Sequence, residues 1–373
     1  MPSEKWPAEF SARTPVRDVL LYLWRKRSSK VRELLHGILA TEIPQSREVH
    51  QIRVATRRLT AYLDVFADEL PTAKSKLLAG TLHKLRSKAG ETRNLDVLQT
   101  FLESLATDPV EPLASPQDWE LIRGYFEHLR TNALDKLKKN LPILLAMLEP
   151  ELLGVESSLE KPGRKRRDSG GKSAATIGAH ALQALPDLTQ KYFKRLHRAP
   201  DDPKELHRLR IKGKAFRYTL ELYAPVLGEC YEQELAPQLA HIQDLLGQLQ
   251  DASVAEEIFE DLEDAVPDLV RQDEDCNKGE RKARGKQIKL FVARLQEANE
   301  NRREQTSEEF RQLVVDLEGK DLQRQFLDHL QTLENLSDTP TIQAQEEKSG
   351  NDSPSSTASE QAPERILFFP KQA

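Results

Sequence analysis

The sequence predicts an all-α protein. Of its 373 residues, 31% are charged and only 6% are aromatic, and only 16 are glycines. The dominant residues, Leu, Ala, Glu, Lys and Arg, all favour helices over sheets. Apolar side chains also recur at the spacing of amphipathic helices along most of the chain. A third observation, an internal repeat, indicates that the helices come in two related sets.

Helical periodicity extends from residue 16 to residue 336. Pro15 stands just before the first helix, where a proline is favoured because its missing N–H would be unpaired anyway. Residues 119–148 form either one long helix or a pair that breaks near Pro142. The predicted helices cover residues 16–39, 50–66, 74–85, 95–105, 119–148, 174–197, 206–223, 230–250, 254–262, 282–300 and 304–336.

Two segments lack this periodicity. Residues 159–171 include the stretch KPGRKRRDSGG, whose Gly and Pro residues indicate a linker. Residues 337–373 are rich in Ser, Pro, Gln, Glu and Asp and have little to bury, which predicts a disordered C-terminal tail. The predicted domain is therefore residues 15–336, with one half over 15–158 and the other over 172–336.

The internal repeat has an offset of 157 residues. The stretch VHQIRV, which begins at Val49, matches LHRLRI, which begins at Leu206. The same offset continues without a gap and pairs Gly90 with Gly247. One offset over about fifty residues predicts that the chain contains two copies of one helical unit.

Each copy carries a basic row on one helix. At about 100° per residue, the apolar side chains form one arc and the cations lie on the opposite side. Stacked like charges destabilise an isolated helix, so the rows indicate an anionic ligand. Guanidinium groups fit phosphate oxygens as planar forks, and His adds a further donor. The apolar arcs contain Ile52, Leu59, Leu63 and Phe66, then Leu209, Phe216, Leu220 and Tyr223. The predicted phosphate-binding residues are His50, Arg53 and Arg57 with Arg58 flanking them, then His207, Arg210 and Lys214 with Arg217 beside them.

A secondary basic set follows in the first half. It contains Lys84, Arg86, Lys88 and Arg93, and either ligand contact or simple surface exposure explains it equally well. The corresponding residues 241–251 contain no Lys or Arg, so the two halves are not equivalent. Asp96 and Asp251 are interpreted as capping or packing partners.

Several chemistries lack their motifs. The sequence contains no GxxxxGK[ST] loop, no HExxH, no paired cysteine spacing and no GxSxG elbow. We therefore expect no enzymatic activity, cofactor or metal. Two cysteines, Cys230 and Cys276, do not make a disulfide framework. The absence of a signal-peptide pattern and of an 18-residue apolar run then predicts a cytoplasmic protein without a membrane span.

The sequence resembles the CHAD family, the conserved histidine α-helical domain. Four stretches carry the resemblance: VHQIRVATRRL, LHKLRSKAGETRNLDVL, LHRLRIKGKAFRY and LLGQLQDASVA. It implies two pseudo-symmetric four-helix bundles, with the basic helices lining a central groove. It also implies binding of inorganic polyphosphate. The sequence departs from the family at two positions. Asn94 stands in place of the usual acidic residue, and Ala215 is neutral at the position that matches the cation Arg58 in the repeat.

The resulting expectation is non-catalytic binding of inorganic polyphosphate, at polyphosphate granules or beside polyphosphate-metabolising enzymes. A binder of nucleic acid or another polyanion is the alternative, because the same cations fit a sugar-phosphate backbone. A phosphohydrolase or kinase and a purely structural scaffold also stay open.

Overall fold

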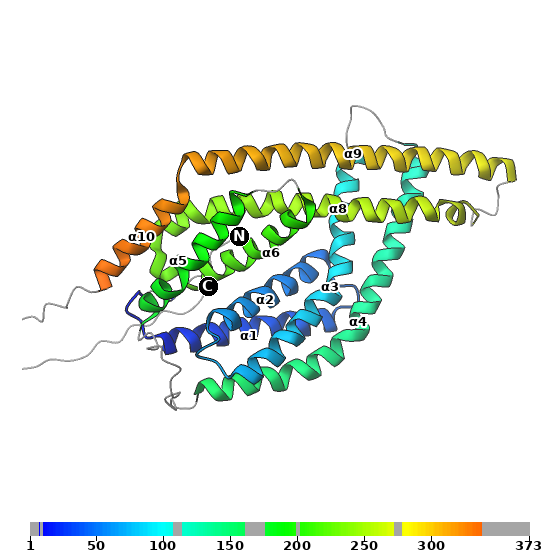
Figure 1. Ribbon diagram of the computed structural model, residues 1–373. Coiled ribbons are helices and arrows are strands. Elements are labelled where there is room, and N and C mark those ends of the chain that lie inside the picture. The colour runs from blue at the N-terminus through cyan, green and yellow to red at the C-terminus, as the bar shows by residue number, and fades with distance from the viewer. Residues whose placement is uncertain are drawn as a thin grey trace, which may run out of the picture. The chain divides into compact units, whose positions relative to one another are not determined.

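The computed structural model is almost entirely helical over the residues that it describes (Figure 1). It contains no strand there, and Pro15 and Thr176 form an isolated β-bridge. The predicted all-α class is therefore confirmed. The described residues are Pro7 and residues 10–106, 114–160, 176–198, 202–271 and 278–337.

The first half of the chain forms four long helices. They are α1 (Val16–Ala40), α2 (Ser46–Val65), α3 (Thr72–Ala106) and α4 (Pro116–Glu160). Helix α2 begins four residues earlier than predicted because Gln45 and Glu48 form a capping box, in which the Gln45 N–H donates to Glu48 Oε2 at 2.9 Å.

The gap predicted in α3 between residues 85 and 95 is wrong, and of the two alternatives for residues 119–148 the structure has the single long helix. Helix α3 runs through Gly90, and α4 runs through Pro142 and includes residues 159–160 of the predicted linker. A proline removes one backbone hydrogen bond, but the leucines around it are buried against neighbouring helices. Tertiary packing therefore keeps the helix continuous where local propensity would end it.

The second half contains more elements than predicted. They are α5 (Ile177–Leu196), α6 (Pro203–Leu222), α7 (Ala224–Cys230), the π-helical turn η1 (Tyr231–Leu235), α8 (Ala236–Arg271), α9 (Lys278–Gly319) and α10 (Leu322–Ser337). The predicted break at residues 251–253 is wrong, because α8 is continuous there. The break predicted at residues 301–303 is also wrong. The chain turns instead after Gly319, where Asp321 adopts a φ of 46°.

The described hydrophobic core does not divide at the predicted linker. One cluster joins residues of both halves and includes Trp24, Phe66 and Tyr223. A second cluster joins the far ends of α3 and α4 to α8 and α9, with Phe126 and Phe259 among its members (Figure 1). The two halves therefore pack as one unit, while the common origin of the repeat stays a prediction.

The segment before α1 fastens the two halves together. The Ile177 N–H donates to Thr14 O, and the Gly178 N–H donates to Ala12 O, both at 2.9 Å. A Cβ at Gly178 would lie 2.7 Å from Ala12 O, so this close approach requires glycine.

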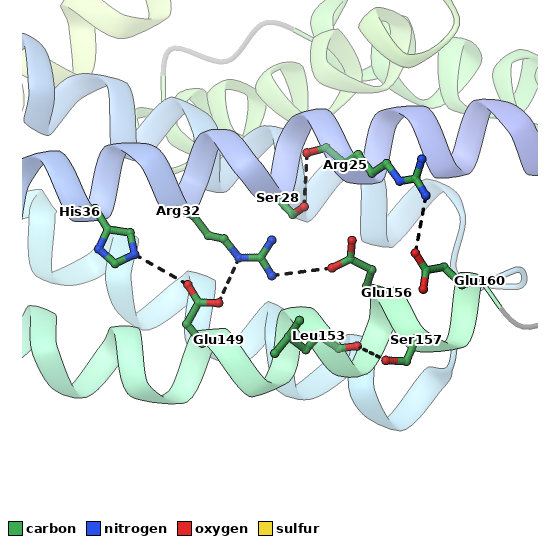
Figure 2. A network of polar contacts seen from close by, with 9 residues as sticks. All are labelled: Arg25, Ser28, Arg32, His36, Glu149, Leu153, Glu156, Ser157 and Glu160. Atoms are coloured by element: carbon green, nitrogen blue, oxygen red, sulfur yellow. Dashed lines mark hydrogen bonds and ion pairs between the residues drawn. The ribbon is translucent and has the colours of Figure 1, made fainter.

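A polar network fixes α1 against the second part of α4 (Figure 2). Arg32 Nε lies 3.1 Å from Glu149 Oε2, and Arg32 Nη2 lies 3.8 Å from Glu156 Oε2. Arg25 pairs with Glu160 at 3.5 Å, but both of these side chains are largely exposed. The Arg32 contacts are better shielded from water, so they contribute more to stability.

Some predictions fall outside the described residues. These are the disordered tail beyond Ser337, the linker from residue 161 onward, and Cys276. Within the described part of the chain, no helix is both long and apolar enough to cross a membrane.

Candidate phosphate-binding site

The two basic helices, α2 and α6, are in contact, and the residue pairs between them show that they run in the same direction. The rings of Phe66 and Tyr223, at their C-terminal ends, lie 6.4 Å apart. About two turns earlier on α2 and more than one turn earlier on α6, the Arg58 guanidinium lies 5.9 Å from the Tyr218 ring. The positions in contact therefore advance together along both helices. The predicted apolar arcs of both helices are buried, which leaves the basic rows free to meet.

Arg53, Arg57, Arg210 and Lys214 form what we call the central cluster. Burial, followed by the charges of Arg57 and Arg210, lowers the pKa of Arg53 to about 10. Burial, followed by Arg210 and Arg57, lowers the pKa of Lys214 to about 7. These shifts show that four cationic groups from two helices share one partly desolvated space.

No ion pair neutralises the central cluster within the described part of the chain. Among the residues that the structure describes, no carboxylate forms an ion pair with any of its four side chains. Arg210 Nε is buried and has no hydrogen-bond partner in that part of the chain. Unpaired buried donors are costly, so this arrangement suits an anion with several acceptor oxygens.

Arg53 is held in place by α3. Its Nη1 donates to the carbonyl oxygen of Arg86 at 2.6 Å. A Cβ on Gly90 would lie 3.1 Å from this Nη1, so the missing side chain of Gly90 makes room for the guanidinium. The sequence repeat identified Gly90 only as a matched glycine.

Helix α3 also supplies part of the cationic wall. Burial and the charge of Arg57 lower the pKa of Arg86. Burial, Arg93 and Arg57 lower the pKa of the half-buried His50. Of the secondary set, the structure thus brings Arg86 and Arg93 to the cluster, whereas Lys84 and Lys88 are exposed on another face of α3.

Two of the predicted ligands are engaged elsewhere. Arg58 Nε donates to Glu221 Oε2 at 2.8 Å, and Arg217 Nε lies 3.8 Å from Glu221 Oε1. Both guanidinium groups also flank the ring of Tyr218. The structure therefore places Arg58 and Arg217 in a clamp between α2 and α6 rather than in the central cluster.

His207 also lies apart from the cluster. It is exposed, and its Nδ1 forms a hydrogen bond with Gln250 Oε1. Both side chains line a cavity of about 570 Å³ between α6, α8 and α9. The two histidines of the repeat thus have different surroundings, although the sequence gives them equivalent positions.

Two charged residues of the site were missed by sequence reasoning. Asp251 on α8 is half-buried, and burial raises its pKa while Arg210, Lys214, Arg93 and Arg302 act to lower it. Arg302 on α9 lies 3.8 Å from the ring centroid of Phe101. The sequence interpretation of Asp251 as a packing residue is incomplete. Arg302 has no counterpart in the repeat motifs that could have identified it.

The charge balance favours an anion over a metal ion at this place. Across the described ranges, no group of three or more His, Cys, Asp or Glu side chains could hold a metal ion. The structure is thus an all-α fold in which two parallel helices bring a cluster of cations together.

Comparison with known proteins identifies this class more closely. Residues 23–260 match the CHAD domain family, and the chain belongs to that family. The resemblance seen in the sequence is therefore confirmed. No curated protein matches the sequence.

Two solved structures are similar to this one. The crystal structure of the CHAD domain from the plant Ricinus communis has a TM-score of 0.58 and 18% identity, and the match covers 84% of this chain and 96% of that one. PptA from Streptomyces chartreusis has a TM-score of 0.47 and 17% identity, over 79% of this chain and 99% of that one. The similarity to the plant domain supports the same fold.

Proposed function

We propose that this protein binds inorganic polyphosphate at the central cluster without catalysing a reaction on it. The observation that carries the proposal is the convergence of Arg53, Arg57, Arg210 and Lys214 without an ion-paired carboxylate among the described residues. A linear polyanion offers closely spaced charges that can neutralise cations from both helices at once. Membership of the CHAD family, which the resemblance connects with polyphosphate, supports the same ligand.

Arg86, Arg93 and His50 extend the cluster toward α3 and are the proposed further contacts. Arg58 and Arg217 keep the helices together, and His207 stands at the periphery. Binding through so many cations releases counterions, so affinity falls steeply as salt concentration rises.

A charge-reversal experiment tests the proposal. Long-chain polyphosphate is titrated with wild-type protein and with the variant in which the four cluster residues are changed to Glu. The matched control changes Lys76, Lys139, Lys194 and Lys286, four exposed lysines on α3, α4, α5 and α9, to Glu. We expect the cluster variant to lose binding and the control to keep most of it. Equal loss in both variants would contradict the site.

Nucleic acid is the second candidate ligand, because its backbone also presents regularly spaced phosphates. The central cluster lies on partly buried helix faces, and only Tyr218 interrupts its basic rows with an aromatic ring, where base stacking would need several. Competition between polyphosphate and duplex DNA at equal phosphate concentration separates the two. Polyphosphate should displace DNA from the protein, and the reverse result would favour a nucleic-acid binder.

The non-catalytic part of the proposal has its own test. Purified protein is incubated with polyphosphate and Mg²⁺ or Mn²⁺, and orthophosphate and chain length are measured. We expect neither to change beyond a protein-free control. Release of phosphate that disappears in the cluster variant would establish an enzyme instead.

The proposed setting is the cytoplasm, at polyphosphate granules or beside enzymes that make or consume the polymer. Co-sedimentation of the tagged protein with granules tests this setting. Loss of co-sedimentation in the cluster variant would connect it to the site.

A further inference from the structure

Helices α3 and α8 form the two walls beside the central cluster, and these walls differ in charge. On the α3 side, Arg86 and Arg93 face the cluster. At the offset of 157, the corresponding residues on α8 are Gln243 and Gln250, which are neutral. The residue after Arg93 on α3 is Asn94, and the residue after Gln250 on α8 is Asp251. The second wall therefore lacks two cations and gains an anion.

Asp251 faces cations from every helix packed around it. Arg210 and Lys214 approach from α6, Arg93 from α3 and Arg302 from α9. Within the described part of the chain, its carboxylate forms no hydrogen bond or ion pair with any of them. The hydrogen bond between His207 on α6 and Gln250 on α8 joins the two helices one residue before Asp251, so the carboxylate acts on these groups through space where α6 and α8 pack together.

The backbone beside Asp251 is held firmly. The side chain of the buried Asn299 on α9 donates through Nδ2 to the Ala252 carbonyl oxygen at 2.9 Å. This bond fixes α8 against α9 one residue after the carboxylate. The backbone next to Asp251 is therefore held in place when another anion enters.

We propose that Asp251 is an internal counter-anion that competes with the bound polyanion for Arg210 and Lys214 and thereby limits affinity. The inference rests on the proposed function. In the free protein, the carboxylate offsets part of the repulsion among the cations. Once phosphates occupy the cluster, the same carboxylate repels them. It also confines the polyanion to the α3 side, where Arg86 and Arg93 supply positive charge.

The test compares Asp251→Asn, which keeps the side-chain shape, with Glu257→Gln, which removes one negative charge from an exposed position on the same helix. At low salt, we expect Asp251→Asn to bind polyphosphate about ten-fold more tightly, because it removes one negative charge from a partly buried position beside the cluster. The gain should shrink at high salt because the interaction is screened. Glu257→Gln should change affinity by less than about two-fold, because exposed charges are screened.

The alternative is that Asp251 only orients Arg210 and Lys214. Weaker binding by Asp251→Asn, or a change no larger than that of Glu257→Gln, would overturn the inference while leaving wild-type binding intact. Absence of binding by the wild type would overturn the proposed function and this inference together. A thermal melt of each variant confirms that the compared proteins are folded.

Discussion

Arg53 passes over the backbone of α3 at Gly90, where a Cβ would lie only 3.1 Å from its Nη1. The same guanidinium donates to the carbonyl oxygen of Arg86. Two helices from the first half of the chain therefore set the direction of a central cation. Gly247, the residue that matches Gly90 in the repeat, has no atom within 4 Å of an added Cβ.

Gly90→Ala should weaken polyphosphate binding. The added methyl displaces Arg53 and disturbs its hydrogen bond, which is worth about 1 kcal/mol, so affinity should fall roughly five-fold. Gly247→Ala is the control, because open space surrounds that position and Ala stabilises a helix by about 0.5–1 kcal/mol relative to Gly. Equal affinities of the two variants in a titration would show that Gly90 does not act through Arg53.

Arg57 and Arg58 are neighbours with separate expected roles. Arg58→Ala leaves the half-buried Glu221 without its closest cation, and the free energy of unfolding should fall by about 1–3 kcal/mol. Arg57→Ala removes a cation without an ion-paired carboxylate among the described residues, so stability should hold while polyphosphate affinity falls about ten-fold. Denaturant melts and titrations of both variants measure the two effects. If Arg58→Ala instead lost affinity and Arg57→Ala lost stability, Arg58 would belong to the central cluster and Arg57 to the clamp.

Polyphosphate affinity should fall as pH rises from about 7 to 9. Burial, Arg210, Arg57 and Arg53 lower the pKa of Lys214 to about 7, and Asp251 only partly opposes them. Above that pH the free amine is neutral, whereas a bound polyanion favours the ammonium, so binding must take up a proton. Lys214→Arg keeps its charge across this range and should bind with a flatter pH profile. Identical profiles for the two proteins would exclude Lys214 as the titrating group.

The α1–α4 network provides a test of stability that is independent of the ligand. Arg32→Ala removes contacts to Glu149 and Glu156 and should lower the free energy of unfolding by about 1 kcal/mol. Arg25→Ala removes the exposed pair with Glu160 and should cost less than about 0.5 kcal/mol. Both variants should bind polyphosphate normally. A loss of binding in either would mean that the network shapes the site.

The sequence predicted the helical class, the family and the cationic rows, because these depend on periodicity within single helices. The repeat also identifies Arg53 and Arg210 as matched residues from the sequence alone. Helix ends were predicted less well. The sequence left open whether Pro142 breaks a helix, and burial of the leucines around it keeps α4 continuous.

The rest of the site depends on contacts between helices far apart in sequence. In the sequence Arg58 flanks the same basic row as Arg57, and only the packing of α2 against α6 places Glu221 beside it. Asp251 and Arg302 join the cluster only because α8 and α9 pack against α6 and α3. The spacing of residues within one helix cannot predict a contact between helices that are far apart in the sequence.

A structure of the protein with bound polyphosphate tests the central assignment most directly. We predict phosphate oxygens within hydrogen-bonding distance of Arg53, Arg57, Arg210 and Lys214, with the chain continuing toward Arg86 and Arg93. Arg58 and Arg217 should stay on Glu221. A polyphosphate chain bound along exposed lysines, with the central cluster unoccupied, would contradict the assignment.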